Sequence, residues 1–191
     1  MSGDQTLQTE DECRIGVLVL GLGNVLLGDD GLGAAVVARL EREYFVPPGV
    51  RLIDGGTLGL SLLGLLAESD HVILVDAVRA DDPPGSLVRL DGADVSDAVR
   101  DRLSPHQVGV ADVLEAARLI DRYPMSVTLL GLVPDAIELA VIRSRAVDAN
   151  LDALVAAVVH EVQSLGHEMV REPNAVCRDR PIHDLTRHFG M

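Results

Sequence analysis

The sequence predicts an α/β fold: one domain built on a mostly parallel, five-stranded twisted sheet with helices on both faces. Apolar, strand-like runs alternate along the chain with stretches in which apolar residues recur at helical spacing. The first run, IGVLVLGLG at residues 15–23, is continuously apolar, which is typical of a strand buried on both faces of a parallel sheet. At 191 residues, 48% of them hydrophobic and only 2% aromatic, the chain is long enough for one domain with an aliphatic core.

The first half of the chain is predicted to contain three strands and two helices in alternation. After the first strand, residues 30–44 carry apolar side chains at helical spacing, and a Pro-Pro pair ends this unit. A second strand, VRLIDGG, ends at Asp54, and a second helix follows with Thr57 as its N-cap. A third strand, HVILVDAV, ends at Asp76.

The second half is predicted to add two strands and two helices. The connection DDPPG is too short for a helical crossover, so we expect local antiparallel pairing of the fourth strand that follows it. SPHQVGVADVLEAARLI predicts a loop and a third helix, SVTLLGLVP a fifth strand, and AVDANLDALVAAVVHEVQSLG a fourth helix ending at Gly166. The predicted domain spans residues 14–167, between a disordered acidic tail at 1–13 and a loosely ordered tail at 168–191.

Charge and composition argue against several classes of partner. With 30 acidic and 16 basic residues, the formal net charge is −14, which would repel both nucleic acid and an anionic membrane surface. The acidic first segment lacks the features of a secretory signal, so we expect a cytoplasmic protein. Cys13 and Cys177 lie far apart without metal-binding spacing, which predicts free thiols rather than a disulfide.

Three aspartates follow the predicted parallel strands: Asp30 after the first, Asp54 at the end of the second and Asp76 at the end of the third. The carboxyl ends of parallel strands meet at one edge of a sheet, and ligands of open α/β sheets bind there. Each residue could also serve only as a turn or helix-start residue, because Asp is favoured at both positions. Position alone does not separate the two interpretations.

The stretch GLGNVLLGDDGLG, at residues 21–33, tests a nucleotide-binding hypothesis. The dinucleotide fingerprint G-x-G-x-x-G would need glycine at position 26, where the chain has Leu26. Asp29 and Asp30 would also repel a phosphate group. A nucleotide-binding regulator is therefore disfavoured, whereas carboxylates at a concave edge favour a divalent cation.

One histidine is placed where a ligand could reach this edge. His106, in LSPHQVG, lies on a loop before a predicted helix, although a surface loop histidine would look the same. No G-x-S-x-G elbow is present, so a serine hydrolase is disfavoured. The remaining chemistry is metal-assisted hydrolysis with two carboxylates and an imidazole, a set that suits zinc or nickel.

Three motifs taken together resemble one family. They are GLGNVLLGDDGLG, DGGTLGLSLLG with VDAV, and SPHQVGVADVL, in this order along the chain. From about Ile15 to Gly166, the chain resembles the [NiFe]-hydrogenase maturation endopeptidases. The resemblance implies a protease that removes a short C-terminal extension from the precursor of the hydrogenase large subunit, after nickel has been inserted into that precursor.

By motif position, the resemblance implies that Asp30, Asp76 and His106 are the metal-contacting and catalytic residues. The metal is nickel carried by the substrate, and zinc or cadmium could take its place in a crystal. The implied partner is the nickel-loaded precursor of the [NiFe]-hydrogenase large subunit. The general base stays open among Asp29, Asp54 and Asp76. A non-enzymatic nickel carrier that uses the same three ligands is the alternative function.

Overall fold

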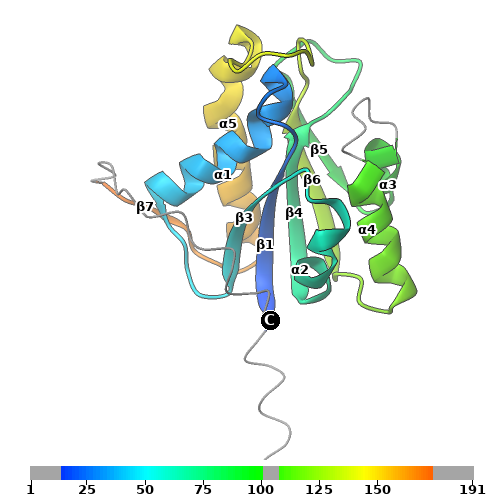
Figure 1. The fold of residues 1–191 in the computed structure, drawn as a ribbon. Coiled ribbons are helices and arrows are strands. Elements are labelled where there is room, and N and C mark those ends of the chain that lie inside the picture. Colours follow the sequence, from blue (N-terminus) through cyan, green and yellow to red (C-terminus); the bar gives the residue numbers. More distant parts are fainter. Residues whose placement is uncertain (1–13, 101–107, 174–191) are drawn as a thin grey trace, which may run out of the picture.

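The computed structural model describes residues 14–100 and 108–173 and contains a five-stranded sheet between two layers of helices (Figure 1). Its strands are β1 (Ile15–Leu22), β3 (Val50–Gly56), β4 (Ser69–Ala77), β5 (Leu87–Asp91) and β6 (Ser126–Leu132). The strand order across the sheet is β3-β1-β4-β6-β5, with only β5 antiparallel to its neighbour. This arrangement confirms the predicted fold class.

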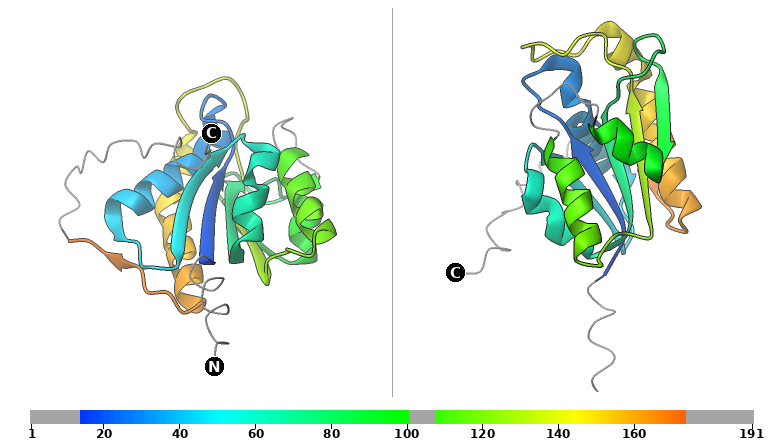
Figure 2. Two further views of the ribbon diagram at one scale, coloured as in Figure 1. Left: turned by 60° about the horizontal axis from the view of Figure 1, so that its bottom comes forward. Right: turned by 90° about the vertical axis from the view of Figure 1, so that its right-hand side faces the viewer.

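Helices cover both faces of the sheet, as Figures 1 and 2 show. Helices α1 (Leu32–Glu43) and α5 (Arg145–Ser164) pack on one face. Helices α2 (Leu63–Ala67), α3 (Ala93–Arg100) and α4 (Val108–Leu119) lie on the other. In the part of the chain that the structure describes, no helix is both long and apolar enough to cross a membrane.

The interior strand β1 shows how one short sequence contributes to the core on both faces of the sheet. Val17 and Val19 are fully buried against the α1 and α5 layer, and Leu18 and Leu20 are fully buried against the α2, α3 and α4 layer. Successive strand side chains point to opposite faces, so a strand covered on both sides must be apolar at every position. The continuous apolar run predicted this placement.

The fourth strand was predicted to pair locally, and its neighbour differs from that expectation. Strand β5 is antiparallel, but it pairs with the later strand β6, with Leu90 opposite Leu129, and not with the preceding β4. Strand β6 lies between them. Its residues after Ser126 are all buried, and a mostly apolar strand of this kind suits an interior position. Strand β5 alternates exposed and half-buried residues, which suits a sheet edge.

One further prediction about local structure was wrong, and one helix was missed. Thr57 does not cap the second helix: the 3-10 turn η3 (Gly59–Leu62) has Leu58 at its N-cap, without a side-chain cap bond, and continues into α2. Helix α3 was not predicted at all. Its short amphipathic segment is stabilised by tertiary packing, with Val95 fully buried in the core.

The chain that follows α5 stays attached to the domain. Strand β7 (Val170–Arg171) pairs antiparallel with β2 (Tyr44–Phe45), and Met169 is 2% exposed within the core. The described domain therefore extends to Pro173, six residues beyond the boundary expected from sequence. The remaining parts of both predicted tails, with Cys13 and Cys177 among them, lie outside the described residues.

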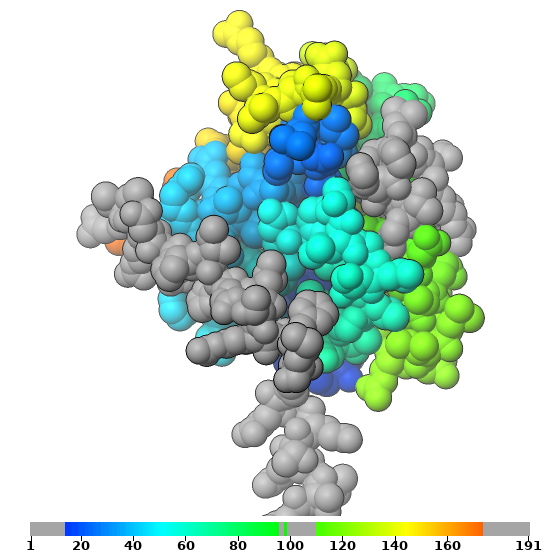
Figure 3. Space-filling model, viewed as in Figure 1, coloured from blue at the N-terminus to red at the C-terminus, as the bar shows by residue number. Residues whose placement is uncertain are grey.

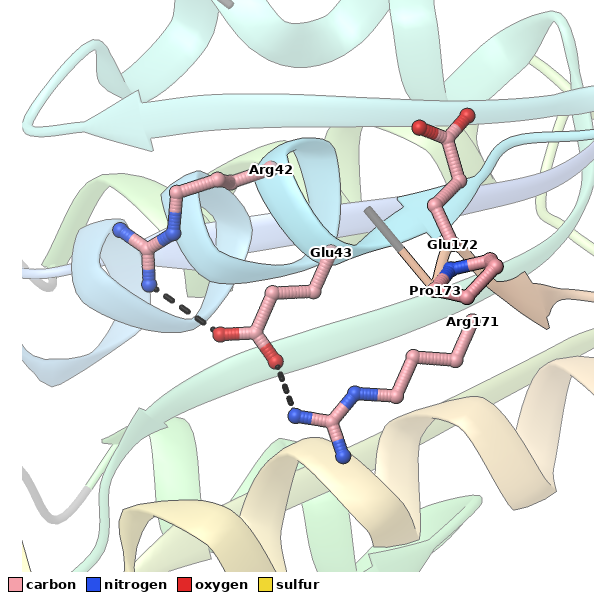
Figure 4. A pocket seen from close by; sticks show the side chains of 5 residues that line it. All are labelled: Arg42, Glu43, Arg171, Glu172 and Pro173. Carbon is pink, nitrogen blue, oxygen red and sulfur yellow. Dashed lines mark hydrogen bonds and ion pairs between the residues drawn. The ribbon is translucent and has the colours of Figure 1, made fainter. Parts of the chain in front are cut away.

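A half-buried carboxylate, that of Glu43, joins this C-terminal segment to the end of α1. Glu43 accepts hydrogen bonds from Arg39 Nε at 2.9 Å, Arg42 Nη2 at 3.2 Å and Arg171 Nη2 at 2.8 Å. The arginines from α1 and β7 converge on Glu43 at a pocket of about 580 Å³ (Figure 4). Burial raises the pKa of Glu43, but the hydrogen bonds from Arg39 and Arg42 outweigh burial and leave that pKa below its usual value.

We expect acid to weaken the wild-type protein more than a Glu43→Gln variant. A carboxyl group whose pKa is lower in the folded state contributes stability above its unfolded pKa, 4.5 for Glu, and loses that contribution as the pH falls through the folded pKa. Urea unfolding of both proteins from neutral to acidic pH measures the difference. Glu172→Gln is the matched control, because Glu172 lines the same pocket but points away from the arginines in Figure 4. Equal acid losses in the wild type and Glu43→Gln would contradict the prediction.

Candidate functional site

The carboxyl ends of three parallel strands form one edge of the sheet. In the ladder, Gly21 of β1 pairs with Asp54 of β3 on one side and with Val75 of β4 on the other. Asp76 follows Val75 directly. Asp54 and Asp76 therefore flank β1 at the same edge, but two interstrand spacings, roughly 9–10 Å, separate their strands.

The start of α1 lies directly on this edge. At Gly33, a Cβ atom would come within 2.4 Å of Leu22 N and 2.5 Å of Val75 O, so the helix backbone touches the ends of both β1 and β4. The 3-10 turn η2 (Gly28–Gly31), which precedes α1, also contacts β4. This close approach brings Asp30, within η2, to the strand that carries Asp76.

Asp30 is fully buried, and a tight turn of the chain closes around it. Its Oδ2 accepts a hydrogen bond from Asn24 N at 2.8 Å. Gly23 has φ = +105°, and a Cβ there would lie 1.8 Å from Asp30 O, so only glycine fits. The glycines of the first motif thus allow the backbone to fold against Asp30.

Asp76 is also fully buried, whereas Asp54 is exposed. Asp76 Oδ1 accepts a hydrogen bond from Ala77 N at 2.6 Å. Asp54 Oδ1 accepts from Gly56 N at 3.0 Å, which is the bond of a turn-forming aspartate. The structure therefore buries both Asp30 and Asp76 at this edge and leaves Asp54 exposed, a distinction that strand-end position could not supply.

Asp29 has a role that sequence reasoning missed. It is 2% exposed, and its carboxylate accepts hydrogen bonds from three backbone N–H groups of the β6–α5 connection: Asp135 at 2.9 Å, Ala136 at 3.4 Å and Ser144 at 2.7 Å. Both oxygens are thus engaged by a loop more than 100 residues away in sequence. Asp29 is a bridge between two loops, and only its position beside Asp30 could have drawn attention to it.

His106 lies within residues 101–107, outside the described residues, and α4 begins two residues after it at Val108. Within residues 14–100 and 108–173, no three His, Cys, Asp or Glu side chains form a group able to hold a metal ion. Of the three predicted ligands, the described residues include Asp30 and Asp76 but not His106. Another histidine, His71, lies near the start of β4 at the opposite edge, where its Nδ1 lies 2.8 Å from Ser126 Oγ.

The fold and this edge together define a class of protein. It is an α/β protein whose candidate chemistry lies at the carboxyl edge of a parallel sheet, in the position where such folds bind ligands. The turn at that edge presents the buried carboxylates of Asp29 and Asp30 instead of a phosphate-binding cradle.

Comparisons with known proteins identify the family. A profile of the hydrogenase maturation protease family matches residues 34–161. The hydrogenase 2 maturation protease of Escherichia coli K12 is 37% identical over 155 residues, covering 81% of this chain and 94% of that protein. The hydrogenase expression/formation protein HupD of Rhodobacter capsulatus is 39% identical over 157 residues, covering 81% of this chain and 75% of that protein.

Solved structures agree with the sequence comparison. The hydrogenase maturating endopeptidase HybD from E. coli superposes with a TM-score of 0.79 at 36% identity, over 82% of this chain and 98% of that one. A [NiFe] hydrogenase maturation protease from Thermococcus kodakarensis gives 0.61 at 26% identity, over 75% of this chain and 96% of that one. The chain belongs to the hydrogenase maturation protease family, and it is a hydrolase of the endopeptidase class.

Proposed function

We propose that this endopeptidase removes the C-terminal extension of a [NiFe]-hydrogenase large-subunit precursor after nickel has been inserted into that precursor. The family and the names of its relatives support hydrogenase maturation as the process. The observation that carries the proposal is the pair of fully buried carboxylates, Asp30 and Asp76, that the η2 turn and β4 bring to one sheet edge.

The chemistry of the donor set supports nickel as the feature that is recognised. Two carboxylates and an imidazole, Asp30, Asp76 and His106, offer oxygen and nitrogen donors of the kind that bind divalent nickel or zinc. In the proposal the metal arrives with the substrate, so these residues distinguish nickel-loaded precursor from nickel-free precursor. A precursor without nickel would lack the ion that they contact.

The proposed reaction is hydrolysis of one peptide bond. Contacts from Asp30, Asp76 and His106 to the substrate's nickel would position the scissile peptide at the edge, and a water molecule would attack the peptide carbonyl. A carboxylate would accept a proton of that water and return it to the amine nitrogen that leaves as the C–N bond breaks. The engagement of Asp29 by three backbone N–H groups argues against it as the general base and leaves Asp54 and Asp76.

A cleavage assay on a purified hydrogenase large-subunit precursor tests the proposal. Nickel-loaded and nickel-free precursor are incubated with the protein, and the products are scored by intact mass. We expect loss of the C-terminal peptide from the nickel-loaded form alone. Equal cleavage of both forms would exclude nickel recognition. No cleavage of either form, with stoichiometric nickel retained by the protein itself, would instead support the carrier function.

A further inference from the structure

Five large apolar side chains gather on two loops beside the candidate site. We call this surface the apolar ridge, and its residues are Val25, Leu26, Leu139, Val141 and Ile142. Each is more than half exposed, and Leu139, Val141 and Ile142 are 85%, 81% and 84% exposed. Exposed apolar groups gathered in one place commonly mark an interaction site.

Backbone hydrogen bonds join the two loops of the ridge. Ala140 N donates to Leu26 O at 3.0 Å, and Gly28 N donates to Ala140 O at 2.7 Å, so the segments run side by side as a short β-bridge. In the space-filling view the yellow β6–α5 connection lies against the blue segment that follows β1 (Figure 3). The five exposed side chains therefore lie on two segments that run side by side.

Hydrogen bonds hold the ridge in place, and the ridge adjoins Asp30, one of the proposed metal-contacting residues. Asp29 binds the β6–α5 connection at both of its ends, through Asp135 N and Ser144 N. On the other side, Asp30 N donates to Leu27 O at 3.3 Å. The ridge is thus preorganised, and its first loop, which carries Val25 and Leu26, is directly connected to Asp30.

We propose that the apolar ridge docks the folded body of the protein substrate, apart from the peptide that enters the site. This inference rests on the proposed function. Continuity with the candidate site of an endopeptidase identifies the occupant as the polypeptide substrate. Leu139, Val141 and Ile142 project with more than four-fifths of their surface exposed, a shape that fits a hollow on a folded partner better than an extended peptide.

The test is a double variant, Leu139→Ser with Ile142→Ser, assayed on nickel-loaded hydrogenase large-subunit precursor. Both side chains are exposed, so the thermal midpoint should stay within about 2 °C of the wild type. We expect KM to rise at least about tenfold, with kcat within about twofold, because truncating the anchors of an interface weakens binding without touching the reacting atoms.

The matched control is Leu119→Ser with Met125→Ser, two apolar residues that are 86% and 75% exposed at the opposite edge of the sheet. We expect KM for this variant to match the wild type. An unchanged KM in the ridge variant would overturn the proposal. So would sedimentation showing that the wild type is a dimer and that the ridge variant is a monomer, because the ridge would then contact a second copy of this chain.

Failure of the proposed function gives a different result. If the wild type cleaves no precursor, the proposed function fails, and calorimetric binding of the same precursor then decides the role of the ridge. Weaker binding by the ridge variant than by both the wild type and the control variant would still support docking. Equal affinity for all three proteins would overturn it.

Discussion

Replacing either buried carboxylate of the candidate site by its amide, Asp30→Asn or Asp76→Asn, should lower the rate of precursor cleavage by about 10²–10³-fold or more. Asparagine keeps the volume of the side chain and an oxygen that can accept from Asn24 N or Ala77 N. It removes the negative charge that would contact nickel. The measurement is a single-turnover time course on nickel-loaded precursor, followed by intact mass.

Asp70→Asn is the matched control for this pair. Asp70 is near the start of β4, at the opposite edge from Asp76, and its carboxylate pairs with Arg14. We expect its cleavage rate to stay within about twofold of the wild type, because the removed charge lies far from the site. Thermal unfolding of all variants separates lost chemistry from lost folding. Full activity in Asp30→Asn or Asp76→Asn, with a normal thermal midpoint, would contradict the assignment of that residue.

The largest expected effect on stability comes from Gly33→Ala. Helix propensity alone would predict stabilisation of about 1 kcal/mol. However, the added Cβ would lie 2.4 Å from Leu22 N and 2.5 Å from Val75 O, both backbone atoms that cannot rotate away. The start of α1 would have to move off the sheet, so we expect the free energy of unfolding to fall by about 3 kcal/mol. Urea unfolding measures this change.

Gly64→Ala provides a control with the opposite sign. Gly64 lies within helix α2, and among the described residues no heavy atom outside its chain neighbours and its own helix backbone is within 4 Å of the position that its Cβ would occupy. Only the propensity difference remains, so this variant should be more stable by about 0.5–1 kcal/mol. If Gly33→Ala were also stabilising, the close approach of α1 to the strand ends would not hold in solution.

Local pattern was sufficient to predict most of the elements. Continuous apolar runs identify β1, β4 and β6, because a strand covered on both faces needs apolar side chains at every position. The end of α5 was predicted from Gly166, whose φ of +89° is a conformation that glycine adopts without strain. The β2–β7 pair escaped prediction because two residues in each strand carry no periodicity.

The strand that pairs with β5 could not be predicted from local sequence. Its antiparallel direction followed from the short connection before it, but its neighbour β6 comes more than 30 residues later in the chain. Which strand takes an interior place depends on burial of both faces of the whole sheet. The short turn restricts only the two strands that it joins. The expected pairing of β5 with its preceding strand was therefore wrong.

The sequence by itself determined the class of fold, the family, and the edge at which Asp30 and Asp76 lie, because strand and helix periodicities are local and parallel strands end together. Only the tertiary structure decided that Asp54 stays exposed while Asp76 is buried, since β3 is an edge strand of the sheet and β4 lies between β1 and β6. It also decided that Asp29 binds backbone groups more than 100 residues away and holds the apolar ridge beside the site. Such contacts leave no local pattern, because the residues that form them meet only when the sheet and α5 are already assembled.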